Sequence, residues 1–144
     1  MLPLYRRTGG RFTFVTEDMK TIRLRVKLNW KTRNYVGAIF GGSMYGATDP
    51  IYMFQFIHIL GSDYVVWDKS STVEYRKPGK STVFAEFIID DTTIENVKAK
   101  VAEHGKFVFE LPIDIKTKDG TSICYITKTL YVASKEYYST RLLK

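Results

Sequence analysis

Asp49 is the residue of this sequence whose surroundings most favour chemistry. Between positions 35 and 62 it is the only formally charged residue. A carboxylate among apolar side chains is costly to bury unless it has a partner or a function, and such groups mark candidate functional sites. We therefore take Asp49 as the central candidate for a catalytic group.

Two adjacent glycines, Gly41 and Gly42, precede Asp49. Glycines at the start of a helix let a ligand approach the backbone, and the exposed N–H groups there stabilise a developing oxyanion. Paired glycines also mark ordinary turns and close packing. Taken alone, the pair is compatible with either interpretation.

The proline after Asp49 leaves two structural interpretations open. Asp followed by Pro is typical of a helix N-cap with Pro at the first helical position, and this predicts a helix from there to Leu60. If the helix begins near Gly42 instead, Pro50 lies inside it, removes one hydrogen bond, and meets the carbonyl of Gly46 with its ring. A kink at Asp49 would then expose backbone acceptors beside the carboxylate.

The apolar segment 35–62 that carries these residues is predicted to be a buried helix. Its glycines, the Asp49-Pro50 pair, Gln55 and His58 interrupt the hydrophobic run, and a carboxylate in the middle of a bilayer costs several kcal/mol. A membrane span is therefore not expected.

Strand patterns occupy most of the remaining chain. Residues 22–30 alternate between apolar and polar types, which predicts a strand with one buried face, and residues 11–16 form a weaker strand before it. Residues 64–76 and 81–90 are predicted to form a hairpin around Lys77-Pro78-Gly79. Residues 107–115 and 121–133 are the last two predicted strands, joined by the Asp119-Gly120 turn.

A short amphipathic helix is predicted at 91–105. Ile94, Val97 and Val101 share one helical face. Thr92 and Glu95 form a capping-box pattern, and Gly105 supplies the stop. Farther along, Pro112 falls on the polar face of its strand, which indicates a sheet edge or a bulge.

These elements predict one α+β domain spanning residues 1–144, with residues 1–10 as an N-terminal extension and 91–105 as an inserted helix. The chain has 144 residues, of which 44% are hydrophobic and 15% aromatic, so it can bury one sizeable core but not two. Strands joined by tight turns are antiparallel, and an apolar helix needs burial on most sides. A long central helix wrapped by a curled antiparallel sheet satisfies both demands.

This arrangement is that of the hotdog fold, and residues 34–49 resemble the signature of its phenylacetate-type thioesterases. That signature has an asparagine, a glycine, then His-Gly-Gly and a later aspartate, and the matching positions here are Asn34, Gly37, Gly41, Gly42 and Asp49. Residues 75–79, Tyr-Arg-Lys-Pro-Gly, are similar to the Phe-x-Arg-Pro turn of such enzymes. Together with residues 48–53 and 67–69, these blocks most resemble a largely uncharacterised bacterial branch of the superfamily.

The resemblance implies an acyl-coenzyme A thioesterase that needs no cofactor. Asp49 would act as general base on water or as nucleophile, Gly41 and Gly42 would hold the thioester carbonyl, and Asn34 would orient it. The substrate-binding residues carried over are Phe40, Ser43, Met44, Tyr45, Thr48, Met53, Ser70, Ser71, Lys69, Lys77 and Lys80. The lysines would meet the phosphates of coenzyme A, although a solvated hairpin tip is the more common explanation for such residues.

One position departs from the signature, because Phe40 stands where those enzymes have histidine, and neither His58 nor His104 aligns to replace it. The loss of this polar group favours an alternative, a non-catalytic hotdog module that binds an acyl or other apolar ligand. The resemblance also implies a homodimer or homotetramer with sites at the subunit interface.

Composition restricts the other function classes. The net charge of +7 attracts anions, but the 22 basic residues are spread along the chain without a nucleic-acid motif, so no nucleic-acid partner is expected. The single cysteine, Cys124, excludes an internal disulfide and favours a reducing, cytoplasmic location. No cluster has the spacing of metal ligands.

Overall fold

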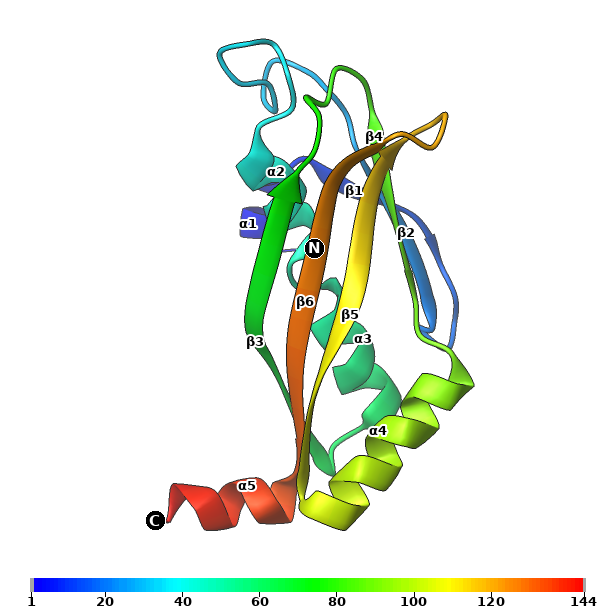
Figure 1. The fold of residues 1–144 in the computed structure, drawn as a ribbon, viewed down its shortest axis with the longest axis vertical. Helices are drawn as coiled ribbons and strands as arrows, with labels where there is room; N and C mark the ends of the chain where they lie inside the picture. The colour runs from blue at the N-terminus through cyan, green and yellow to red at the C-terminus, as the bar shows by residue number, and fades with distance from the viewer. Residues whose placement is uncertain (1, 144) are drawn as a thin grey trace.

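The computed structural model describes residues 2–143 and is an α+β fold built on one six-stranded antiparallel sheet. The sheet order is β1-β2-β4-β5-β6-β3. The strands are β1 (Gly10–Val15), β2 (Thr21–Val26), β3 (Tyr64–Tyr75), β4 (Val83–Ile88), β5 (Lys106–Thr117) and β6 (Ser122–Ser134). The helices are α1 (Pro3–Arg7), α2 (Gly41–Thr48), α3 (Ile51–Leu60), α4 (Asp91–His104) and α5 (Lys135–Leu142). Figure 1 shows α2 and α3 lying against one face of β3, β6 and β5, while β2 and β1 curve away behind the opposite edge.

The predicted long central helix is broken into α2 and α3 at Asp49-Pro50. Pro50 has no N–H to continue the helical hydrogen bonding, so the second of the two interpretations is the one observed. The break leaves the carbonyl of Ala47 to accept a hydrogen bond from the Tyr5 hydroxyl at 2.7 Å. Among residues 2–143, no helix has both the length and the apolar character that a membrane crossing requires.

The strand predicted at 22–30 ends at Val26, four residues early. Beyond it the chain turns around Asn29, whose carbonyl accepts hydrogen bonds from the amides of Thr32 and Arg33 at 3.1 and 3.0 Å. The Thr32 hydroxyl donates to the carbonyl of Lys27 at 2.6 Å. These local bonds satisfy the backbone groups that the strand would have needed.

The hairpin predicted from 64–76 and 81–90 is wrong. β3 pairs with β6 at one edge of the sheet, and β4 pairs with β2 and β5. The segment between β3 and β4 passes β6 and β5, which separate these two strands in the sheet. At its start, the amides of Arg76 and Lys77 donate to the carbonyl of Ile123 in β6 at 2.8 and 3.1 Å. Alternation identified both strands correctly, but it carries no information on which strand pairs with which.

The helix predicted at 91–105 is confirmed as α4, with a different cap. Asp90 accepts a hydrogen bond from the Thr93 amide at 2.7 Å, so the Thr92–Glu95 capping box is wrong. Gly105 ends the helix in the left-handed region at φ 81°, as predicted. Pro112 of β5 lies opposite Thr127 of β6 on one side. On the other side β4 pairs with β5 only near residues 116 and 117, so Pro112 has no strand partner there, in agreement with the predicted sheet edge.

The core lies between α2–α3 and the inner face of the sheet. Phe56 of α3 is completely buried, and its ring packs edge-on against Phe109 of β5 with centroids 5.3 Å apart. Phe54, two residues earlier, is 52% exposed, so α3 is apolar on a face that this chain alone leaves uncovered.

Replacing Phe56 with alanine is expected to cost about 3–5 kcal/mol of unfolding free energy, because the lost ring leaves a cavity. Phe54→Ala on the same helix is the matched control, and we expect it to cost less than about 1 kcal/mol. Urea unfolding of both variants measures the difference. Equal losses would contradict the assignment of Phe56 to the core.

Candidate functional site

Asp49 lies at the break between the two helices, and it does not cap α3. It ends α2 with helical backbone angles, φ −51° and ψ −52°. The residue before α3 is Pro50, and no side chain caps that helix. The N-cap interpretation of Asp49 is therefore wrong, and its side chain, 42% exposed, is free to interact elsewhere.

The partner of Asp49 is a buried lysine of β6. The side chain of Lys128 is 2% exposed, and its ammonium donates a hydrogen bond to Oδ1 of Asp49. The same ammonium lies 3.5 Å from Oδ2 of Asp68 on β3 and 5.5 Å from the centroid of the Tyr45 ring. One buried cation thus connects a helix terminus with two neighbouring strands.

A bulge in β3 sets which side chains face this cation. The register against β6 shifts between Asp68 and Ser70, so Ser71 rather than Ser70 lies opposite Lys128. Lys69 and Ser70 are both exposed, whereas Asp68 and Ser71 are partly buried on the inner side. The extra residue therefore places Asp68 and Ser71 on the same face of the strand.

The electrostatics of the cluster follow from two carboxylates sharing one ammonium. Burial opposes the charged form of Lys128, but the hydrogen bond to Asp49 and the charges of Asp68 and Asp49 outweigh it, so the pKa of Lys128 is raised. Burial also raises the pKa of Asp68; the charge of Lys128 opposes this shift and that of Asp49 adds to it. Lys128 is accordingly charged at neutral pH, while Asp68 takes up a proton more readily than a free aspartate.

Two of the predicted substrate-binding residues join this cluster. The Tyr45 hydroxyl donates a hydrogen bond to the Ser71 hydroxyl at 3.1 Å, which ties α2 to β3 beside Lys128. The Thr48 hydroxyl is directed back to the carbonyls of Met44 and Tyr45 at 3.0 Å. Ser43 and Met44 are buried, and Met53 is partly buried against the core.

The two glycines at the start of α2 are covered by aromatic rings. A Cβ on Gly41 would lie 2.8 Å from Cε1 of Tyr75, and a Cβ on Gly42 would overlap the ring of Phe40. The first amides of a helix have no partner within it. The rings of Tyr75 and Phe40 therefore occupy the space that side chains at positions 41 and 42 would take, and glycine leaves that space to them.

Asn34 organises its own loop. Its side-chain oxygen accepts hydrogen bonds from the amides of Val36 and Ala38, both at 3.1 Å. Lys80 donates to the carbonyl of Val36 at 2.6 Å and lines one surface cleft together with Lys77, whereas Lys69 lies apart on β3. The structure thus brings together two of the three lysines expected to contact phosphates.

Cys124 does not join the cluster. It is fully buried on β6, and burial raises the pKa of its thiol to about 11, which keeps it protonated. Over residues 2–143 no group of three His, Cys, Asp or Glu side chains is arranged to hold a metal ion.

Lys128 is the residue that sequence reasoning missed. It stands in phase with Ile126 and Leu130 on the buried face of a strand. Residues two apart in a strand share a face, so a lysine between two buried apolar residues of that face must itself be buried. A buried cation in turn indicates a buried anionic partner. That signal was present in the sequence.

Asp68→Asn is expected to change the pH dependence of stability. Because the pKa of Asp68 is raised in the folded chain above its ordinary value of 3.8, its contribution to stability is full below that value and is lost as pH rises through the folded pKa. The unfolding free energy of the wild type should therefore fall relative to that of the variant as pH rises from 3.8 through the folded pKa. Urea unfolding of both chains at a series of pH values tests this prediction. A wild-type stability that stays constant or rises relative to that of the variant would contradict it.

Comparisons with known proteins agree with this fold. A probable thioesterase of unknown function from Pseudomonas aeruginosa superposes with a TM-score of 0.77 at 19% identity, over 90% of this chain and 85% of that one. A protein of unknown function from Chlorobaculum tepidum gives 0.74 at 15% identity, over 93% and 88%. A thioesterase from Haemophilus influenzae gives 0.64 at 18% identity, over 90% and 81%.

At these identities the likeness establishes the fold alone. A search of curated protein sequences finds no match. Residues 1–132 match the family described as "Domain of unknown function (DUF4442)". Because that match spans nearly the whole sequence, the chain belongs to the DUF4442 family.

Proposed function

We propose that this chain is a hotdog-fold hydrolase of acyl thioesters, and that Asp49 is its catalytic carboxylate. The observation that carries the proposal is the pairing of a partly exposed carboxylate with a fully buried ammonium. Lys128 holds Oδ1 of Asp49, which leaves Oδ2 as the oxygen able to approach a water molecule or the substrate. Structural neighbours that are named thioesterases add support at the level of the fold.

The reaction assigns a distinct task to each group. Oδ2 of Asp49 accepts a proton from water as the water oxygen attacks the thioester carbonyl. The resulting oxyanion is stabilised by the amides of Gly41 and Gly42, and collapse of the tetrahedral intermediate expels the thiolate. Lys128 is a positioning residue, since it contacts the carboxylate and not the reacting atoms.

The substrate is proposed to be an acyl-coenzyme A or a similar acyl thioester. Tyr45 and Ser71 lie beside Lys128 and would contact the acyl group or the carbonyl. Lys77 and Lys80, which line one cleft, would meet the phosphate groups. Asn34 acts through its loop, because backbone amides already occupy its side-chain oxygen.

The same proposal includes a homodimer that brings its sites to the subunit interface. β3 is an edge strand of twelve residues, and it exposes Trp67 and Tyr75. A long edge with exposed aromatic side chains is a surface that proteins commonly cover with another strand. Ser70 and Lys69 of β3 would then lie next to the partner's site.

Phe40 favours a second candidate, a non-catalytic module that binds an acyl or other apolar ligand. Its ring is 57% exposed and lies over Gly42, at the end of α2 where the resemblance predicts the carbonyl to bind. An apolar ring there suits an acyl chain better than a developing negative charge. Binding of an acyl thioester without turnover would support this candidate.

Asp49→Asn is expected to lower kcat/KM for acyl-coenzyme A hydrolysis by about 100- to 10,000-fold, because the amide cannot accept the proton from water. The assay measures thiol release from short-, medium- and long-chain acyl-coenzyme A. Asp63→Asn is the matched control, since Asp63 is exposed and forms no ion pair within the described residues. A folded Asp49→Asn variant with wild-type turnover would refute the proposal.

A further inference from the structure

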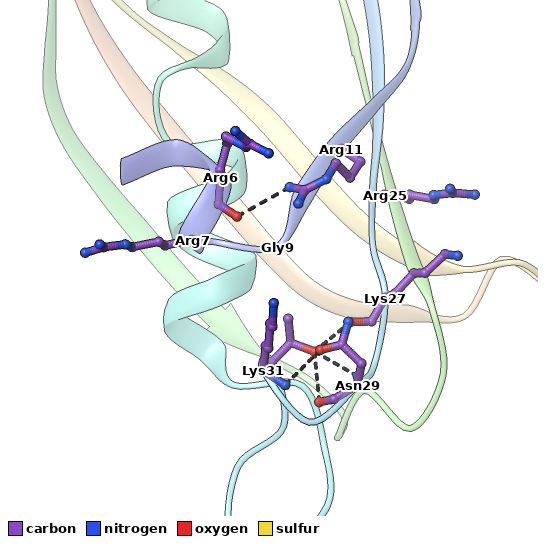
Figure 2. A pocket seen from close by; sticks show the side chains of 9 residues that line it. Arg6, Arg7, Gly9, Arg11, Arg25, Lys27, Asn29 and Lys31 are labelled. Atoms are coloured by element: carbon purple, nitrogen blue, oxygen red, sulfur yellow. Dashed lines mark hydrogen bonds between the residues drawn. The ribbon is translucent and has the colours of Figure 1, made fainter. Parts of the chain in front are cut away.

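A second candidate site lies away from Asp49, in a basic cleft between the N-terminal segment and β2. The cleft has a volume of about 540 Å³ and is formed by α1, the start of β1, the end of β2 and the loop 29–32. Figure 2 shows Arg6 and Arg11 lying close together above Gly9, with Lys31 rising from the loop and Arg25 and Lys27 extending from β2. Its cationic lining residues are Arg6, Arg7, Arg11, Arg25, Lys27 and Lys31.

No carboxylate offsets this charge. The remaining lining residues are Gly9, Asn29 and Thr32, and none of the six cations forms an ion pair with an acidic side chain in the part of the chain that the structure describes. Arg23, two residues before Arg25 on the same strand, is paired with Glu86. Like charges gathered in one concavity repel one another and attract an anion.

Hydrogen bonds within the chain hold the Arg11 guanidinium and the loop that carries Lys31. The Arg11 guanidinium donates to the carbonyls of Gly10 and Arg6 at 2.7 and 3.4 Å. The loop that carries Lys31 is held by Asn29, whose side chain accepts a hydrogen bond from the Lys31 amide at 2.8 Å. Nε of Arg25 is buried without a hydrogen-bond partner. A buried N–H group without an acceptor is rare, and here it belongs to a residue that lines the charged cleft.

We propose that this cleft binds a small soluble ligand carrying two or more linked phosphoryl groups, such as a nucleoside diphosphate. Four of the six cations are arginines, whose planar forks pair with phosphate oxygens through two parallel hydrogen bonds. One phosphate would leave most of the cationic charge unbalanced, whereas a diphosphate matches more of it. The concave shape suits a compact anion better than an extended polymer.

The cleft shares no lining residue with the Asp49 cluster. It lies on the α1 and β1 side of α2, where Tyr5 donates to the carbonyl of Ala47, whereas Asp49 faces β6. Binding there uses none of the groups assigned to the proposed hydrolysis. The two proposals can succeed or fail separately.

Titration calorimetry of the full chain with inorganic pyrophosphate and with ADP tests the proposal. We expect one ligand per chain and an affinity that falls with added salt. Arg6→Gln/Lys31→Gln should weaken binding at least tenfold, because both side chains are exposed and donate no hydrogen bond in the described structure. Lys98→Gln/Lys135→Gln is the matched control, since it removes the same charge from α4 and α5, and it should leave the affinity within twofold.

Arg25→Gln provides a single substitution should the double variant unfold, and it too should weaken binding of pyrophosphate at least tenfold. The proposal would be overturned if neither pyrophosphate nor ADP bound. It would also be overturned if Lys98→Gln/Lys135→Gln weakened binding as much as Arg6→Gln/Lys31→Gln. It would also be overturned if a single-stranded oligonucleotide or phosphatidic acid vesicles bound while pyrophosphate and ADP did not. Hydrolysis of acyl-coenzyme A by each variant reports separately on the Asp49 site.

Discussion

The buried ammonium of Lys128 is the constraint on which the rest of the site depends. A lysine placed in phase with Ile126 and Leu130 must bring anions with it, because an uncompensated charge inside a core is strongly destabilising. Asp68 from the neighbouring strand and Asp49 from the helix break supply them. The demand for neutrality therefore fixes three elements relative to one another, and it leaves one carboxylate, that of Asp49, partly exposed at the end of α2.

The helix break is the second half of the same arrangement. Pro50 has no N–H to extend α2, so the helix ends at Asp49, and the carboxylate at this terminus reaches Lys128 of β6. The carbonyl of Ala47 that loses its helical donor is satisfied by the Tyr5 hydroxyl, whose pKa burial raises to about 12. The N-terminal segment consequently packs on α2, and this packing also forms one wall of the basic cleft.

Local patterns predicted the strands and the two turn-joined pairs β1–β2 and β5–β6, but not the partners of β3 and β4. Alternation located the strands, and Gly105 located the end of α4, because both depend on neighbouring residues. The pairing of β3 with β6 and of β4 with β5 depends on contacts distant in sequence, and the pattern of each strand fits several partners. Asp49 was found because a lone carboxylate in an apolar segment stands out. Lys128 was missed because it stands between two threonines in β6, and only the strand's phase marks it as buried. The basic cleft joins residues from four segments and had no local signal at all.

Asp49 and Lys128 are proposed to act as one unit in thioester hydrolysis. A double-mutant cycle of kcat/KM with Asp49→Asn, Lys128→Met and the double variant, each checked for folding, measures this coupling directly. If Lys128 works by holding Asp49, the double variant should be no slower than Asp49→Asn alone, since the lysine has nothing left to position. If the two losses multiply, Lys128 acts independently of Asp49, and the proposed division of roles between carboxylate and ammonium is wrong.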